Sequence, residues 1–217
     1  MKIKLPVIEF LYNEDKIKLT NIQWKLYYYL VSISKHNFIS KQDFKKENCC
    51  KVLNTNLTTY YKAIKALTTH NLITIYSDAI IINDIMNNYV KIELSVLKVL
   101  LYFSKNTDLI KLYLIFLKYG DSRIKHFTKN KIIEMLGHAG RNNKFYPLAQ
   151  NYLDILQNLK LIDLTTEEKK CCGKSYNSYI VNKVYETNDY FKSDKLSEIL
   201  SNIPDEIKEK YIQGPSD

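Results

Sequence analysis

Residues 54–75 decide the fold, and their sequence is Asn-Thr-Asn-Leu-Thr-Thr-Tyr-Tyr-Lys-Ala-Ile-Lys-Ala-Leu-Thr-Thr-His-Asn-Leu-Ile-Thr-Ile. The stretch opens with residues that cap helices, and its apolar side chains then recur at helical spacing. These apolar residues are Leu57, Tyr60, Tyr61, Ile64 and Leu67. The opposite face is polar or cationic and carries no acid: Thr58, Lys62, Lys65 and Thr69. Asn71 can end the helix, and Leu72 and Ile73 start an extended run.

A polar-faced helix that leads into a β-ribbon is typical of a winged helix-turn-helix, in which that helix meets DNA. The alternative is an ordinary surface helix ahead of a hairpin. On its N-terminal side, Thr20 or Asn21 can cap a helix to about Ser34. Ser40 can cap a short helix to about Lys46, followed by a loop over residues 47–53. On its C-terminal side, residues 74–76 and 79–83 are predicted strands.

The same order of patterns returns in the second half of the chain, displaced by 86 to 89 residues. An ordered repeat of this kind indicates two similar modules. The matching pairs are Ile3 with Val90, Trp24 with Ile110, Leu30 with Phe116, Ile39 with Phe127, Phe44 with Ile132, Leu57 with Phe145, Ile64 with Tyr152, Leu67 with Ile155, and Leu72 with Leu161. We therefore expect a mainly α chain with small β-ribbons, an α+β fold. It would hold two tandem pseudosymmetric winged helix-turn-helix modules, residues 1–86 and 87–186, with a boundary near Met86.

Residues 187–217 are expected to form an acidic C-terminal helical tail of one or two amphipathic helices, packed on the second module or on another subunit. The formal charge of the 217-residue chain is +9. It is divided as +5 over residues 1–86, +7 over 87–186 and −3 over 187–217. A basic body favours a polyanionic partner, although a solvated lysine-rich surface explains the charge alone equally well.

Hydrophobic residues make up 46% of the chain, which permits a core and argues against disorder. The sequence has no apolar run of about 18 residues and no signal-peptide pattern, so we expect a cytoplasmic protein and no membrane partner. The cysteines form two adjacent pairs, Cys49-Cys50 and Cys171-Cys172. Neither pair has CxxC spacing, which argues against a zinc site.

Candidate DNA-binding residues lie on the predicted recognition helices and wings. In the first module they are Asn54, Asn56, Thr58, Lys62 and Lys65. In the second they are Arg141, Asn142, Asn143, Lys144, Tyr146 and Gln150 near the helix, and Lys169, Lys170 and Lys174 in a wing loop over residues 165–175. Arg141 or Gln150 can contact base edges bidentately, whereas wing lysines contact phosphates. Glu167 and Glu168 in the same loop favour the alternative, a wing that does not touch DNA.

The sequence contains no catalytic motif. Gly173-Lys174-Ser175 resembles the end of a P-loop, but Glu168 occupies the position of its first glycine. The four histidines lack HxH or HExxH spacing. We therefore expect no enzyme activity, no catalytic residue, no metal and no cofactor.

A resemblance adds to this interpretation. Residues 106–119, then Phe127-Thr128, residues 132–137 and Lys144-Phe145-Tyr146, are similar in order to the second winged helix of iteron-binding plasmid replication initiators. Residues 19–26 match the first helix of that family more loosely, and the resemblance covers about residues 19–165. It implies paired winged helices that bind repeated origin sites as monomers and repress their own gene as dimers. The chain departs from the family in its shortness, its two arginines and its Cys-Cys wing.

We expect a sequence-specific double-stranded DNA-binding protein, a plasmid or phage replication initiator. Its further partners would be a second copy in a homodimer and host replication proteins. The alternatives are a winged-helix transcriptional repressor of a mobile element and a protein-interaction scaffold that binds no DNA.

Overall fold

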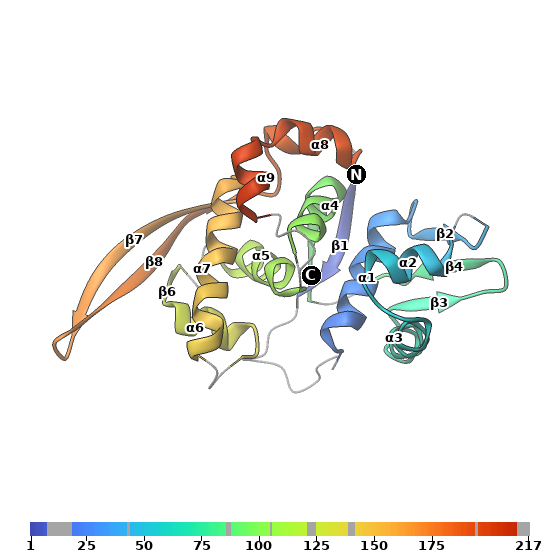
Figure 1. Ribbon diagram of the computed structural model, residues 1–217, viewed down its shortest axis with the longest axis horizontal. Coiled ribbons are helices and arrows are strands. Elements are labelled where there is room, and N and C mark those ends of the chain that lie inside the picture. The colour runs from blue at the N-terminus through green and yellow to red at the C-terminus, as the bar shows by residue number, and fades with distance from the viewer. Residues whose placement is uncertain are drawn as a thin grey trace. The chain divides into compact units, whose positions relative to one another are not determined.

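The computed structural model describes residues 1–7, 19–42, 44–85, 88–104, 106–120, 125–138, 142–193 and 195–211. The chain forms two compact units that combine helices with small β-sheets (Figure 1). The smaller unit comprises Ile17–Tyr89 and Lys105–Thr107. The larger unit comprises Met1–Lys16, Val90–Ser104 and Asp108–Asp217. The expected α+β class is confirmed.

The described part of the smaller unit contains three helices and a three-stranded antiparallel sheet of order β2-β4-β3. Its elements are α1 (Asn21–Ile33), β2 (Phe38–Ser40), α2 (Lys46–Val52), α3 (Leu57–Thr69), β3 (Ile73–Ile75) and β4 (Ala79–Ile82). The α1 helix starts at the expected place, where the Thr20 backbone N–H donates to Gln23 Oε1 at 2.7 Å. The α1 and α3 helices pack together. Trp24 and Leu67 are among the side chains that this packing buries.

The larger unit begins with β1 (Lys2–Pro6), which pairs with β5 (Tyr89–Glu93). A second sheet has the order β6-β8-β7. Its remaining elements are α4 (Leu94–Phe103), α5 (Asp108–Tyr119), β6 (His126–Phe127), α6 (Lys129–Met135), α7 (Asn142–Asn158), β7 (Ile162–Cys171), β8 (Lys174–Val184), η1 (Asp189–Phe191), α8 (Leu196–Asn202) and α9 (Asp205–Tyr211).

The element order of α1–β4 recurs in α5–β8, with the same strand order in the sheet. The turns recur as well. After α2, Asn54 has a φ of 49° and Thr55 N donates to Cys50 O at 2.9 Å. After α6, Gly137 has a φ of 81° and His138 N donates to Ile133 O at 2.9 Å. Both helices therefore end in the same left-handed cap.

The ends of α3 and α7 match equally closely, and they correct the expected residue alignment. Asn71 and Lys160 both have a φ of 54°. Leu72 N donates to Leu67 O, and Leu161 N donates to Leu156 O, both at 2.9 Å. Leu67 therefore corresponds to Leu156 rather than to Ile155, one residue away from the predicted match.

The α2 helix lies later in the chain than predicted. Ser40 does not cap a helix but pairs with Ala79 at the end of β2. The helix occupies Lys46–Val52, within the predicted loop. It forms there because Cys49, Cys50 and Leu53 supply the apolar residues that pack into the core, and all three are buried. Cys49, rather than Phe44, therefore occupies the place that Ile132 has in α6.

Three further parts of the larger unit differ from expectation. The β1 strand, which we grouped with residues 1–86, pairs with β5 in the larger unit. The α4 helix, for which we predicted no element, buries Val96, Leu97, Val99 and Leu100. The predicted loop over residues 165–175 is mostly β-strand, because β7 and β8 pair continuously up to a turn at Cys172-Gly173. The expected boundary at Met86 lies outside the described residues.

Helical spacing also predicts that ten apolar side chains of α1, α3, α5 and α7 are buried in the core, and nine of them are. Trp24, Tyr27, Leu30, Leu67, Leu112, Tyr113, Phe116, Tyr152 and Ile155 are buried. Ile64 is only half-buried, and Leu57 and Tyr61 are exposed. The apolar face of α3 is therefore narrower than its sequence pattern suggested.

The acidic tail packs within the larger unit. This is one of the two arrangements that we predicted, the other being packing on another subunit. The α8 helix contacts α4, and α9 contacts α7. Phe191, Ile199 and Ile203 are buried. Asn158 Nδ2 also donates to the Tyr211 hydroxyl at 2.9 Å, which joins α7 to the end of α9.

Candidate nucleic-acid interface

The solvent-facing side of α3 is polar and cationic. Tyr60, Ala63 and Leu67 lie on its buried face. Thr58, Lys62, Lys65 and Thr69 are all exposed and follow one another at spacings of four, three and four residues. Because α1 and α2 pack against the other side of α3, this stripe is held on a rigid element with two ammonium groups facing water.

Two of the predicted DNA-binding asparagines have structural roles at the start of α3. Asn56 is the N-cap residue, and its Oδ1 accepts a hydrogen bond from Thr59 N at 2.8 Å. Asn54 adopts the left-handed conformation that ends α2, which asparagine tolerates better than most residues. Both side chains are exposed. Their identities are therefore explained by backbone requirements, with or without a contact to DNA.

A groove of about 370 Å³ lies beside α3 in the smaller unit. Its apolar lining consists of Phe44, Tyr60, Tyr61, Ile64, Ile75 and Ile80, and its charged lining of Lys41, Lys45, Lys46 and Glu47. Lys46 Nζ donates to the Tyr61 hydroxyl at 2.9 Å, and this bond raises the pKa of Lys46. The half-burial of Ile64 follows from its position in this groove.

The β3–β4 ribbon of the smaller unit is hydrogen-bonded to Lys41, the residue that follows β2. Lys41 N donates to Asp78 O at 2.8 Å, and Lys41 Nζ donates to Tyr76 O. Tyr76 and Ile75 are exposed on this ribbon. We did not predict these exposed apolar residues or the groove. The alternation of side chains along a short ribbon does not show which of its faces is left without a packing partner.

In the larger unit, the predicted recognition helix α7 contains Asn142, Asn143, Lys144, Tyr146 and Gln150. The side chains of the first three, and Arg141 entirely, lie outside the described residues. The Tyr146 side chain is exposed, although only 36% of its surface is accessible to solvent. Gln150 Nε2 donates to Asp154 Oδ1 and its Oε1 accepts from the Tyr179 hydroxyl, both at 2.7 Å. Both ends of the Gln150 amide are therefore used within the protein, which does not favour the bidentate contact with a base that the sequence suggested.

The long β7–β8 ribbon projects beyond α6 and α7 of its own unit (Figure 1). Lys169 and Lys170 are exposed near its tip, as are Glu167 and Glu168. Lys169 Nζ lies 3.8 Å from Glu167 Oε2, at a surface where such pairs contribute little stability. Lys174 lies opposite Cys171 in the strand register, and its side chain is outside the described residues. The predicted wing lysines thus share the ribbon with acids.

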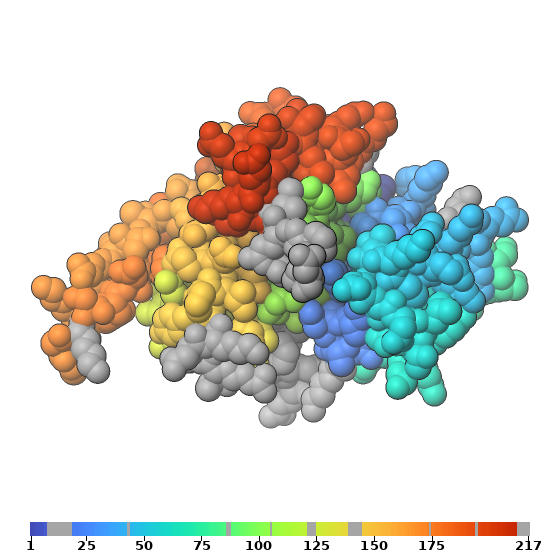
Figure 2. Space-filling view, viewed as in Figure 1, coloured from blue at the N-terminus to red at the C-terminus, as the bar shows by residue number. Residues whose placement is uncertain are grey.

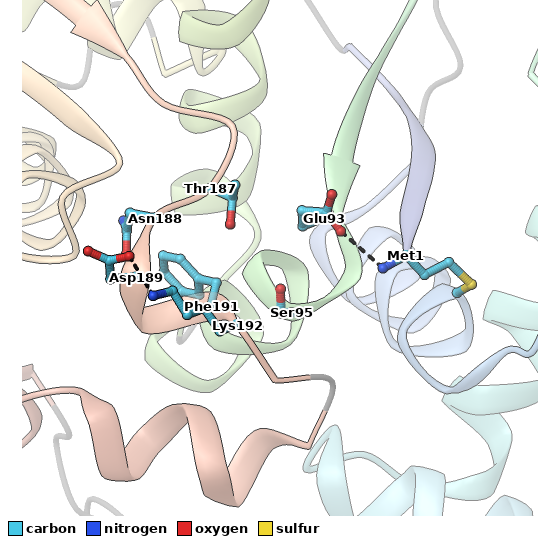
Figure 3. Close-up of a pocket in the computed structure, with 8 residues that line it drawn as sticks. All are labelled: Met1, Glu93, Ser95, Thr187, Asn188, Asp189, Phe191 and Lys192. Carbon is cyan, nitrogen blue, oxygen red and sulfur yellow. Dashed lines mark hydrogen bonds and ion pairs between the residues drawn. The ribbon is translucent and has the colours of Figure 1, made fainter.

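A second cavity, of about 520 Å³, lies in the larger unit (Figure 3). Its charged groups are paired with one another. The Met1 ammonium lies 3.0 Å from Glu93 Oε2, and Lys192 Nζ lies 2.9 Å from Asp189 Oδ1. Asn188 also lines the cavity and uses its Nδ2 to donate to the carbonyls of Leu159 and Lys160. These pairings account for the polar groups, and we assign the cavity no function.

Comparisons of the chain with protein-family models, curated proteins and solved structures find no match. Within the described ranges, no helix is long and apolar enough to cross a membrane. Among the same residues, no three or more His, Cys, Asp or Glu side chains gather as a metal site would require.

Proposed function

We propose that this chain is a sequence-specific double-stranded DNA-binding protein built from two winged helix-turn-helix modules. The observation that carries the proposal is the doubled order helix, strand, helix, helix, strand, strand, with the same sheet order and the same helix-ending turns. In such modules the helix before the ribbon enters the major groove. That helix is α3 in the smaller unit and α7 in the larger one.

The surface chemistry of α3 supports this assignment. Lys62 and Lys65 lie one helical turn apart on its exposed face, with Thr58 beside them. A lysine ammonium can donate a hydrogen bond to a phosphate or to guanine. A threonine hydroxyl can form a hydrogen bond with the edge of either base in a pair. The smaller unit is therefore the better-supported DNA contact, because Lys62 and Lys65 face solvent on α3, whereas Gln150 of α7 is bonded to Asp154 and Tyr179.

Within this class we propose a replication initiator of a plasmid or phage, acting in the cytoplasm. The resemblance to iteron-binding initiators over residues 19–165 supports this choice. A homodimer and host replication proteins are the further partners that we propose. A transcriptional repressor could be built from the same two modules, and it would differ by failing to support replication of a plasmid that carries the origin.

The decisive experiment selects binding sites from a pool of randomised duplexes with the full-length protein. An enriched sequence, retained when competitor DNA is added, would support the proposal. Repeats of that sequence beside the gene, and replication of a plasmid that carries them, would separate initiator from repressor. Equal retention of all duplexes would contradict sequence-specific binding.

A second candidate function, a protein-interaction scaffold, is favoured by the groove beside α3. Its aromatic and aliphatic lining, bordered by Lys41, Lys45 and Lys46, has the mixed character of a peptide-binding surface. Absence of any duplex binding at low salt would favour this candidate, since non-specific electrostatic binding is strongest there.

A further inference from the structure

Two adjacent thiols lie at the tip of the β7–β8 ribbon. Cys171 and Cys172 are free and exposed. Cys172 and Gly173 form the two-residue turn, with φ values of 50° and 74°. Two positive φ values define the type I′ hairpin turn, whose first position usually holds Asn, Asp or Gly. Turn chemistry therefore does not account for a cysteine at position 172.

The separation of the two thiols matches a known coordination geometry. Cys171 Sγ lies 3.7 Å from Cys172 Sγ. Two ligands of a tetrahedral ion with metal–sulfur bonds of about 2.3 Å lie about 3.8 Å apart. We propose that Cys171 and Cys172 bind a thiophilic divalent cation of the zinc class, and that the same cysteines of a second chain complete a four-thiolate site. Although adjacent cysteines lack CxxC spacing, this turn brings their sulfur atoms to the separation that the ion needs.

A second chain is needed because one chain offers only half of a structural zinc site. Closed sites of this kind have four protein ligands. Among the described residues, no third His, Cys, Asp or Glu side chain joins the two thiols in a group. The turn itself is open, since a Cβ built on Gly173 would meet no atom within 4 Å apart from its chain neighbours. Figure 2 shows the end of the ribbon, in orange, as a projection from its own unit.

The charge of the tip suits this site. Residues 167–174 carry three lysines and two glutamates, a net charge of +1. A divalent cation with four thiolates carries −2, which two such tips would neutralise. The flanking lysines thus gain a role that does not depend on DNA binding.

The other adjacent pair provides a contrast within the same protein. Cys49 and Cys50 are buried in α2. Burial raises the pKa of the Cys49 thiol to about 12, which opposes the thiolate that a metal requires. Metal binding by the folded chain should therefore be confined to the exposed pair.

The test is a titration of the reduced, full-length chain with Co²⁺, an ion that reports tetrahedral thiolate ligation by its absorption. We expect sulfur-to-cobalt charge-transfer bands that saturate at one ion per two chains and disappear when Zn²⁺ displaces the cobalt. Each ion should release four protons as four thiols become thiolates. Sedimentation equilibrium should show the mass of the chain doubling with Zn²⁺ and returning to its initial value with EDTA.

The combined substitution Cys171→Ser and Cys172→Ser should abolish both the bands and the mass change, while Cys49 and Cys50 remain in place. Ser175→Ala, which alters the tip but keeps the thiols, should behave as the wild type. Bands of equal strength in the wild type and the double variant, or no bands in either, would overturn the site. Saturation at one ion per chain with no change in mass would overturn its sharing between two chains.

Discussion

The hydroxyl of Tyr179 lies 2.7 Å from Oε1 of Gln150, and this bond joins β8 to the middle of α7. Tyr179 is buried, and its ring stacks on Phe127 of β6 with centroids 5.5 Å apart. One side chain therefore connects the sheet of the larger unit to the helix that we propose for DNA recognition. The position of α7 depends in part on this bond.

Tyr179→Phe should lower the free energy of unfolding by about 1 kcal/mol, because it removes the donor and leaves the Gln150 oxygen without this partner. The measurement is urea unfolding followed by circular dichroism. Tyr176→Phe is the matched control, since Tyr176 is exposed on the same strand. An equal loss in both variants would show that the Gln150 bond contributes nothing of its own.

Substitutions at Asn54 can separate its backbone role from a contact with DNA. Asn54→Ala should lower the free energy of unfolding by about 1–2 kcal/mol, because alanine resists the left-handed conformation. Asn54→Gly should preserve stability, because glycine adopts that conformation readily. Weaker duplex binding by a fully folded Asn54→Gly variant would assign the amide to DNA, whereas unchanged binding would leave it only the structural role.

The paired substitution Lys62→Ala and Lys65→Ala should weaken duplex binding and reduce its dependence on salt. The slope of log affinity against log salt should fall by roughly 0.9 for each phosphate that the protein no longer neutralises. Fluorescence anisotropy over a range of salt concentrations measures both effects. Lys195→Ala is the control, because Lys195 forms an ion pair with Glu198 on α8. Identical slopes in the wild type and the paired variant would place the DNA elsewhere.

Leu67 and Leu156, both 0% exposed, allow the described core packing of α3 and α7 to be tested. Replacing either with alanine should cost about 2–5 kcal/mol, because each substitution removes buried methyl groups and leaves a cavity. Leu57→Ala should change stability by less than about 0.5 kcal/mol, because Leu57 is exposed. Differential scanning calorimetry and urea unfolding measure these differences. A large loss at Leu57 would contradict the described packing of α3.

Cys49 should resist alkylation in the folded protein. Since its pKa is raised to about 12, only about one molecule in 10,000 carries the thiolate at pH 8, against roughly one-quarter for a thiol of pKa about 8.5. The raised pKa also means that stability from the neutral thiol is complete below pH 8.5 and is lost as the pH rises toward 12. Iodoacetamide labelling with peptide mapping should modify Cys171 first and Cys49 only after unfolding. Rapid labelling of Cys49 at pH 8 would contradict its burial.

The sequence predicted the elements whose signals are local and strong. The α3 helix combines capping residues, a clear apolar face and Asn71 as a terminator, and it lies where predicted. The α2 helix was misplaced because Ser40 suits an N-cap in isolation, whereas in the fold it pairs with Ala79 in the sheet. Burial of Cys49 and Cys50 decides the true position of α2, and cysteine gives a weak helix signal.

The sequence predicted the polar face of α3. It did not predict the groove beside α3 or the hydrogen bonds of Gln150 in α7. Thr58, Lys62 and Lys65 follow from helical spacing alone. The partner of Gln150 is Tyr179, 29 residues away on another element, and no local pattern reveals such a bond. The separation of the Cys171 and Cys172 sulfur atoms likewise depends on the turn that the ribbon adopts.

The pairing of β1 with β5 has a consequence for how the protein forms on the ribosome. Between the end of β1 and the start of β5 lie 82 residues, which include α1, α2, α3 and the β2-β4-β3 sheet of the smaller unit. At about 5–20 residues per second, β1 emerges about 4–16 s before its partner strand is made. The smaller unit can complete its own sheet in that interval. The larger unit must then form around a first strand that was synthesised before the whole of the neighbouring unit.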